Sequence, residues 1–220
     1  MEFFAPLWDV VLYLWDVAVH LDRHLAALLA QYGTWVYAIL FLIIFAETGF
    51  VVTPFLPGDS LLFVAGALCG AGSMDIWVLN GTLIAAAVLG NSVNYSIGRY
   101  LGPKVFHWEN SRFFNKAALM KTHVFYEQHG GKTLVITRFI PILRTFAPFV
   151  AGIGAMTYVR FQAFNVSGAV LWVGSLSVAG YLFGNLPIIQ NNLSLVILAI
   201  IVVSTMPAAI GYIQHRRAKH

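Results

Sequence analysis

Four charged residues stand in otherwise apolar parts of the sequence: Glu47, Asp59, Arg138 and Arg144. Arginine is always charged, and its planar guanidinium group can bind the oxygen atoms of a phosphate through paired hydrogen bonds. Two arginines six residues apart could together neutralise a phosphomonoester, which carries a charge of about −1.5 to −2. The residue after Arg144, Thr145, adds a hydroxyl group to this candidate phosphate site. Burial disfavours the charged form of a carboxyl group, so a partly buried acid can bind and release a proton closer to neutral pH. Glu47 and Asp59 are therefore candidates for coupling the transport of an anion to protons.

The composition places these residues in a membrane protein. Of the 220 residues, 59% are hydrophobic and 10% are charged, whereas soluble domains carry about 25% charged residues. A net charge of +4 in so apolar a chain indicates contact with an anionic membrane surface and not with nucleic acid. Because Cys69 is the only cysteine, the chain can form no intramolecular disulfide and no cysteine-based metal cluster. We expect neither a metal nor an organic cofactor.

Long stretches without Asp, Glu, Lys or Arg predict the helices that cross the membrane. A span needs about 20 apolar residues, and charge-free stretches of at least that length cover 24–46, 76–98 and 161–215. We expect one membrane domain over residues 1–220. Its four spanning helices are predicted near 33–50, 76–99, 160–183 and 190–212. The other segments are predicted as an amphipathic interfacial helix (1–30), a basic cytoplasmic loop with a surface helix (103–130) and a basic cytoplasmic tail (213–220).

Two further apolar stretches are too short to cross the membrane and are interrupted by prolines. Proline removes a backbone donor and breaks a helix. Irregular backbone at membrane depth survives only inside protein or beside a wet cavity. We therefore predict two re-entrant hairpins, near 52–72 and 133–156. The residues expected to shape them are Pro54, Pro57, Gly58, Pro141 and Pro148.

The two halves of the chain resemble each other. The matching runs are Phe55–Pro57 with Phe139–Pro141, Phe63–Gly66 with Phe149–Gly152, and Gly98–Gly102 with Gly180–Gly184. We take 33–102 as the first repeat and 131–184 as the second. Basic residues gather in 99–132 and in the C-terminal tail, which the positive-inside rule assigns to the cytoplasm. This orientation inverts one half relative to the other, and inverted repeats of broken helices are a transporter design with the substrate site between the halves.

The four charges at membrane depth have two interpretations. Each charge at the bilayer centre costs about 2.5–3.5 kcal/mol on insertion scales. Structural ion pairs between the hairpins would explain them. We favour a functional site, because ionisable groups inside a membrane usually mark a pathway.

Other polar and aromatic residues are assigned simpler roles. Hydrogen bonds between helices explain Asn91 and Asn94 most simply, and lining of the lipid path is the alternative. The six Trp and nine Tyr residues are expected to form belts at the membrane–water interfaces.

Three runs of residues resemble the DedA family of bacterial membrane proteins, within the wider SNARE-associated Golgi or VTT-domain superfamily. They are Glu47–Gly49, Pro54–Asp59 and Arg138–Gly152, and Gly90–Asn91 with Asn94–Tyr95 also fits. The resemblance covers roughly 30–215 and implies lipid transport. Members are associated with the return of undecaprenyl phosphate across the cytoplasmic membrane, some with phospholipid flipping, and the family is linked to the proton motive force. The acids and arginines that the family requires match Glu47, Asp59, Arg138 and Arg144 here.

The sequence thus predicts an all-α polytopic membrane protein with an inverted repeat of two re-entrant hairpins, about four transmembrane helices and amphipathic surface helices. With the resemblance, the expected function is proton-coupled flipping of undecaprenyl phosphate across the bacterial cytoplasmic (inner) membrane, with the C-terminus in the cytoplasm. A proton-independent phospholipid scramblase and an ion or proton antiporter are alternatives. We do not expect an enzyme, because an intramembrane phosphatase would need acid–base histidines and the hairpins contain none. The expected partners are a lipid phosphate, protons and membrane lipids, and a homo-oligomer is left open.

Overall fold

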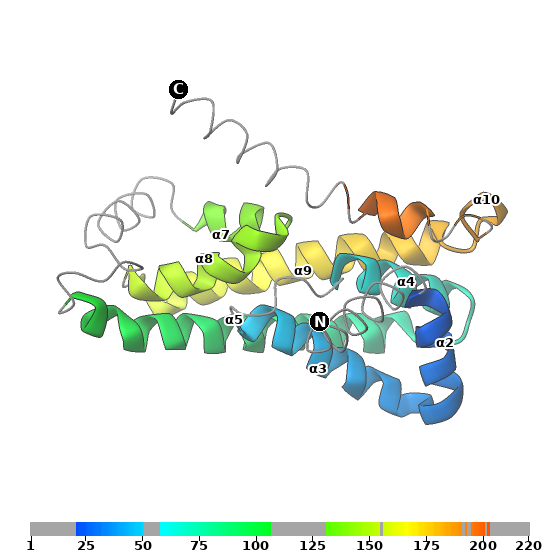
Figure 1. The fold of residues 1–220 in the computed structure, drawn as a ribbon, viewed down its shortest axis with the longest axis horizontal. Helices are drawn as coiled ribbons and strands as arrows, with labels where there is room; N and C mark the ends of the chain where they lie inside the picture. Colours follow the sequence, from blue (N-terminus) through cyan, green and yellow to red (C-terminus); the bar gives the residue numbers. More distant parts are fainter. Residues whose placement is uncertain are drawn as a thin grey trace, which may run out of the picture.

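The computed structural model describes residues 21–50, 58–106, 131–154, 156–190, 192, 195–200 and 202. Within these ranges the chain is helical and contains no strand, which confirms the predicted all-α class (Figure 1). The helices are α2 (Leu21–Tyr32), the 3-10 helix η1 (Gly33–Trp35), α3 (Val36–Gly49), α4 (Gly58–Gly70), α5 (Ile76–Phe106), α7 (Lys132–Thr137), α8 (Pro141–Ile153), α9 (Tyr158–Phe183) and α10 (Pro187–Gln190). Residues 195–200 are also helical.

Three segments of the described chain are long and apolar enough to cross a membrane: Arg23–Gly49, Ile76–Leu101 and Tyr158–Phe183. The second and third coincide with the spans predicted near 76–99 and 160–183. The first contains most of the span predicted near 33–50 but begins ten residues earlier, within the predicted N-terminal helix (1–30). The parts of the prediction that lie wholly or mostly outside the described residues are the fourth span (190–212), the first twenty residues of the N-terminal helix, the basic loop (103–130) and the tail (213–220).

The first of these segments bends at η1. Gly33 has a φ angle of +55° there, a conformation that glycine adopts readily. Figure 1 shows α2 and α3 leaving this turn in different directions. On α2, Leu21 and Leu25 are buried and Arg23 is exposed, as the amphipathic pattern predicts. Because α2 packs on α4, its apolar face is covered by protein.

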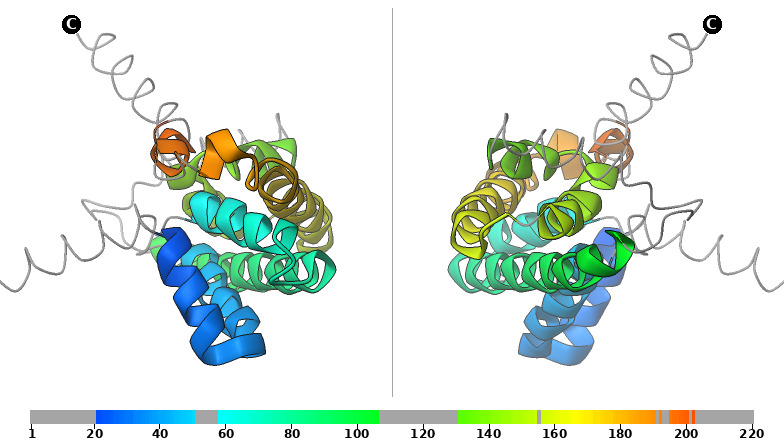
Figure 2. Two further views of the ribbon diagram at one scale, coloured as in Figure 1. Left: turned by 90° about the vertical axis from the view of Figure 1, so that its right-hand side faces the viewer. Right: turned by 90° about the vertical axis from the view of Figure 1, so that its left-hand side faces the viewer.

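The two longest helices, α5 and α9, lie antiparallel against each other (Figure 1). Near one end, Ser177 of α9 donates a hydrogen bond to Asn80 of α5 at 2.8 Å. Towards the other end, Gln162 of α9 donates to Ser92 of α5 at 2.7 Å. Residue numbers therefore rise along one helix as they fall along the other. The end-on views of Figure 2 show α4, α5 and α9 packed together, with α2 and α3 extending to one side.

The helices α7 and α8 form a helical hairpin. The backbone amides of residues 138–140 bond to carbonyls three residues earlier and so close a tight turn. Pro141 then begins α8, where its missing N–H removes no helical hydrogen bond. Pro148 lies inside α8 and leaves the carbonyl of Arg144 without its helical partner. The chain thus reverses within the predicted range 133–156, and its re-entrant placement in the membrane stays a prediction.

Only one limb of the first predicted hairpin, 52–72, is described. This limb is α4, whose residues are buried on nearly all sides, as expected of a helix that is apolar all round. Pro54 and Pro57 lie outside the described residues.

The hairpin helix of the first repeat packs along the long helix of the second, α4 against α9. Gly66 faces the backbone carbonyl of Ser177, and Gly180 faces that of Phe63. A Cβ atom on either glycine would overlap the carbonyl oxygen that it faces. Glycine therefore allows these two helix backbones to approach closely.

The packing of α8 against α5 repeats this contact with the repeats exchanged: the hairpin helix of the second repeat packs along the long helix of the first. Gly152 faces the backbone carbonyl of Tyr95, and Gly98 faces that of Phe149, again with no room for a Cβ atom. These glycines belong to the runs that match between the two repeats in sequence. The two helix crossings are equivalent, which indicates that an internal twofold relates α4 and α5 to α8 and α9.

Candidate functional site

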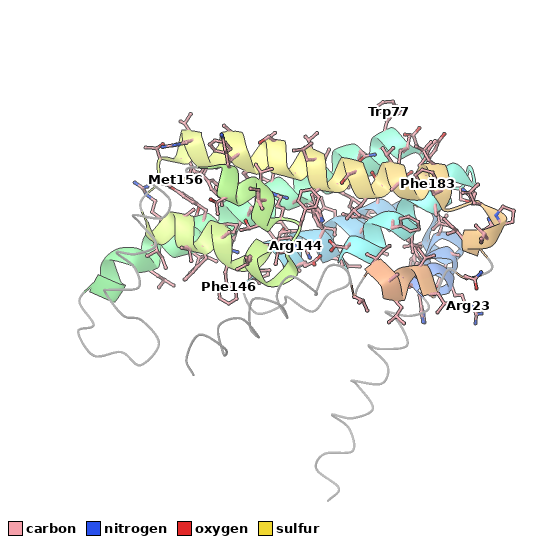
Figure 3. The ribbon with its side chains drawn as sticks, turned by 90° about the horizontal axis from the view of Figure 1, so that it is seen from above. Arg23, Trp77, Arg144, Phe146, Met156 and Phe183 are labelled. Carbon is pink, nitrogen blue, oxygen red and sulfur yellow. The ribbon has the colours of Figure 1, made fainter. Side chains whose placement is uncertain are left out.

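Three of the four predicted charged residues, Glu47, Asp59 and Arg144, come together where the first turns of α4 and α8 meet. Asp59 is in the first turn of α4, and Arg144 is the fourth residue of α8. Figure 3 places Arg144 partway along the bundle, between Met156 towards one end and Phe183 towards the other. In a membrane, the spanning helices would hold these charges well away from both surfaces.

Arg144 pairs with both acids through its two terminal nitrogens, and its Nε atom has no hydrogen-bond partner among the described residues. Its Nη2 atom pairs with Oε1 of Glu47, and its Nη1 atom donates to Oδ1 of Asp59 at 2.7 Å. Trp172 of α9 donates from Nε1 to the same oxygen of Asp59 at 2.9 Å, and its ring centroid lies 4.5 Å from the guanidinium carbon of Arg144. Two carboxyl groups therefore oppose one guanidinium charge, and the indole ring adds a cation–π contact.

Arg138 has different surroundings. It is 1% exposed, and its Nη2 atom donates to Oδ1 of Asn165 at 2.5 Å and to the backbone oxygen of Asn165 at 3.2 Å. Its Nε and Nη1 atoms have no hydrogen-bond partner, and among the residues that the structure describes no carboxyl group pairs with it. The positive charge of Arg144 also acts on it. Arg138 is thus a buried cation with free donors, and a bound anion would satisfy both its charge and its N–H groups.

Asn165 holds Arg138 at the interface of α5 and α9. Its Oδ1 atom also accepts a hydrogen bond from Asn91 at 3.1 Å, and its Nδ2 atom donates to the carbonyl of Val88 at 3.1 Å. A Cβ atom at Gly168 would lie 3.0 Å from Cδ of Arg138, so the absence of a side chain there leaves room for the arginine. The bond made by Asn91 matches the helix-bonding interpretation.

Asn94 links the two backbone segments that carry the ion pair. Its Nδ2 atom donates to the carbonyls of Thr48, at 3.2 Å, and Thr145, at 2.7 Å, which are the residues after Glu47 and Arg144. Both Asn94 and Thr145 are fully buried. Asn94 therefore positions the end of α3 against the start of α8, whereas a part in lining the lipid path stays a prediction.

Gly58 has a steric role beside the acid. It is the first residue of α4, and a Cβ atom on it would overlap the carboxyl group of Glu47. The glycine therefore lets the start of α4 approach the end of α3. In the described part of the chain, Oγ of the buried Ser60 in this region has no hydrogen-bond partner.

Two residues of the site, Asn165 and Trp172, were not predicted. The expected place of the tryptophans in interfacial belts is wrong for Trp172, which is fully buried against Asp59 and Arg144. A usable signal was present, because the two residues are seven apart in the predicted span and so share one face of the helix. An Asn and a Trp on one face of an otherwise apolar span could have indicated the side of α9 that meets the charges.

The fold and the site define a polytopic α-helical membrane protein with an internal twofold repeat and a buried charged centre. The model of the VTT domain matches residues 56–182. The chain is 55% identical to Protein DedA of Escherichia coli (strain K12) over 212 residues, which is 96% of this chain and 97% of the relative. It is also 46% identical over 169 residues to an uncharacterized membrane protein of Mycobacterium leprae, with 77% of this chain and 76% of the relative covered.

A third relative is the inner membrane protein YghB of E. coli (strain K12), which is 34% identical over 195 residues, or 86% of this chain and 84% of the relative. No solved structure matches the chain. The match to the VTT domain and the near full-length similarity to Protein DedA show that the chain belongs to the DedA family of VTT-domain membrane proteins.

Proposed function

We propose that the protein carries a lipid phosphate across the bacterial cytoplasmic membrane and that Arg138 is an anion-binding group of the carrier. The supporting observation is the contrast between the two arginines: Arg144 contacts two carboxyl groups, whereas buried Arg138 keeps two donors free. A phosphate would supply both the missing charge and the missing acceptors. The family resemblance favours undecaprenyl phosphate as the lipid, and the name of the relative YghB favours the inner membrane.

The contact of Arg144 with Glu47 and Asp59 supports coupling to protons. With both acids ionised, this group has one positive and two negative charges and would repel a phosphate. Protonation of the acids from the outer side would release Arg144, so that both arginines could hold the phosphate. Loss of the protons on the cytoplasmic side would restore the ion pairs and expel the headgroup. The lipid passes through chemically unchanged, and the proton motive force drives the transfer.

Leaflet exchange in proteoliposomes tests this proposal. The full chain is reconstituted with fluorescent undecaprenyl phosphate, and exchange is followed with and without an imposed pH gradient. We expect gradient-stimulated exchange by the unmodified protein and at least about a tenfold loss in Arg138→Gln, since the positive charge and the free donors that would bind the phosphate are removed. Glu47→Gln should lose the response to the gradient. Arg160→Gln is the control, because Arg160 is exposed and belongs to no contact of the site.

The outcomes separate this carrier from its alternatives. Exchange that ignores the gradient in the unmodified protein would indicate a proton-independent scramblase. No exchange above empty vesicles would contradict lipid-phosphate transport and favour the ion antiporter. Full activity in Arg138→Gln would show that the free donors of Arg138 do not bind the substrate.

A further inference from the structure

A pocket of about 640 Å³ opens between the C-terminal part of α5 and the start of α9. Its walls are Tyr95, Ser96, Arg99, Tyr100, Thr157 and Tyr158. None of these residues belongs to the charged centre around Arg144. Basic-residue asymmetry predicts that this end of the molecule faces the cytoplasm.

Arg99 gives the pocket a positive charge. Its Nη1 atom donates to the hydroxyl of Tyr95 at 3.1 Å, and that hydroxyl in turn donates to the carbonyl of Met156. Tyr95 is buried, so the arginine is held on a fixed group. No carboxyl group in the described parts of the chain pairs with Arg99. The hydroxyl groups on the pocket wall add further hydrogen-bonding atoms around this cation.

An apolar groove of about 600 Å³ continues from this pocket along α5. Phe45 of α3 and the α5 residues Leu89, Val93 and Ile97 line it, and Ser96 and Tyr100 line both the groove and the pocket. The groove lies on a helix that is long and apolar enough to span the membrane. Because Leu89, Val93 and Ile97 are exposed, hydrocarbon chains would contact the groove in a bilayer.

We infer that the pocket and the groove together are a docking site for one lipid phosphate, with the phosphate at Arg99 and the hydrocarbon chain in the groove. This inference rests on the proposed function. A soluble anion would make no use of the apolar groove, and a neutral lipid would make no use of the positive charge of Arg99. The charge and the apolar surface are complementary to the two parts of a single amphiphile.

A line of hydrogen bonds joins this docking site to the charged centre. Gln162 donates to the hydroxyl of Tyr158 in the pocket wall at 2.5 Å, and it accepts from Asn165 at 3.0 Å. Asn165 in turn accepts from Arg138 at 2.5 Å. Tyr158, Gln162 and Asn165 follow one another at helical spacing along α9, so polar side chains extend from the pocket to the buried arginine. A phosphate at Arg99 is thus at one end of a polar route whose other end is Arg138.

Native mass spectrometry of the full chain in detergent micelles tests the inference, with undecaprenyl phosphate as the ligand and undecaprenol as the chain without phosphate. We expect the unmodified protein to bind two copies of undecaprenyl phosphate. Arg99→Gln should weaken one of them at least about tenfold, and Arg138→Gln should weaken the other. Arg160→Gln is the matched control for the charge. Val93→Trp, which fills the groove, should also displace the Arg99-dependent copy, whereas Val78→Trp on the far part of α5 should not.

The outcomes distinguish the docking site at Arg99 from the proposed function of Arg138. Two copies with unchanged affinity in Arg99→Gln would overturn the docking site and leave the proposed function intact. Loss of binding in Arg99→Gln alone, with Arg138→Gln unaffected, would support the docking site and contradict the role of Arg138. Binding of undecaprenol or inorganic phosphate as tight as that of the lipid phosphate would overturn the amphiphile assignment. No binding at all would contradict both.

Discussion

The two buried arginines differ in how their charge is compensated. Arg144 has Glu47, Asp59 and the ring of Trp172 around it. Among the described residues, Arg138 bonds only to Asn165, an uncharged partner. Burying an ion is costly unless an opposite charge and hydrogen bonds compensate it, and removing one member of a buried pair leaves the other uncompensated. Arg144 therefore has a structural reason to be present, whereas Arg138 is a net cost that a substrate would offset.

This difference predicts opposite effects on stability. Arg144→Met should lower the free energy of unfolding by about 3–5 kcal/mol, because two buried carboxyl groups lose their counter-charge. Arg138→Met should leave it unchanged or raise it, because an uncompensated buried charge is removed. Titration with SDS in mixed micelles, followed by circular dichroism, measures both values.

Neutralising the whole cluster provides the control for this comparison. The variant Glu47→Gln/Asp59→Asn/Arg144→Met should regain most of the lost stability, because no charge is then left unpaired. Equal losses in Arg138→Met and Arg144→Met would contradict the argument and assign Arg138 a structural role.

At the scale of the helices, two equivalent crossings hold the repeats together. In α4–α9, Gly66 lies against the backbone of Ser177, and in α5–α8, Gly152 lies against that of Tyr95. Because the opposing atom is a backbone carbonyl, no side-chain rotation can make room for a larger residue. Each crossing joins one repeat to the other, so the charged centre forms only when both halves are assembled.

The symmetry predicts paired mutational effects. Gly66→Ala and Gly152→Ala should each lower the free energy of unfolding by about 1–3 kcal/mol, and by similar amounts, because each forces one helix pair apart. Gly81→Ala and Gly174→Ala are the controls, since a Cβ atom meets nothing within 4 Å at either position. The free energy of unfolding of these two variants should rise by up to about 1 kcal/mol, because alanine has the higher helix propensity. A lower free energy of unfolding in only one of Gly66→Ala and Gly152→Ala would show that the two crossings are not equivalent.

The helices themselves could be predicted from the sequence, but their pairing could not. Charge-free stretches predicted the helices that became α3, α5 and α9, and Pro141 predicted the turn before α8. The matching glycine runs indicated that two halves are alike. Similarity between halves does not say whether a hairpin packs on its own long helix or on that of the other repeat. For the same reason the contact of Asn165 with Arg138 was missed, since it depends on which face of α9 meets α7.

At the scale of the whole molecule, the loops that join equivalent helices lie at opposite ends. The loop between α4 and α5 contains exposed Ser73, and the loop between α8 and α9 contains exposed Thr157. Figure 1 shows these loops at the two ends of the long axis, because α5 and α9 lie antiparallel. With the long helices crossing a membrane, the two loops face different compartments. A carrier needs this inversion, since each half can then open towards one side around a shared centre.

Cysteine labelling tests the inverted arrangement. In a Cys69→Ala background, Ser73→Cys should react with a membrane-impermeant maleimide in spheroplasts, in which the cytoplasmic membrane is intact. Thr157→Cys should react only after the cells are opened, because the basic residues of 99–132 place its end of the molecule in the cytoplasm. The unsubstituted Cys69→Ala protein, which has no thiol, measures the background.

Reaction of both cysteines from the same side would contradict the inverted repeat and with it a carrier that opens alternately. Reaction from the two sides in exchanged order would keep the inversion and reverse the orientation, so that protons and lipid would be expected to enter the charged centre from the end near Thr157.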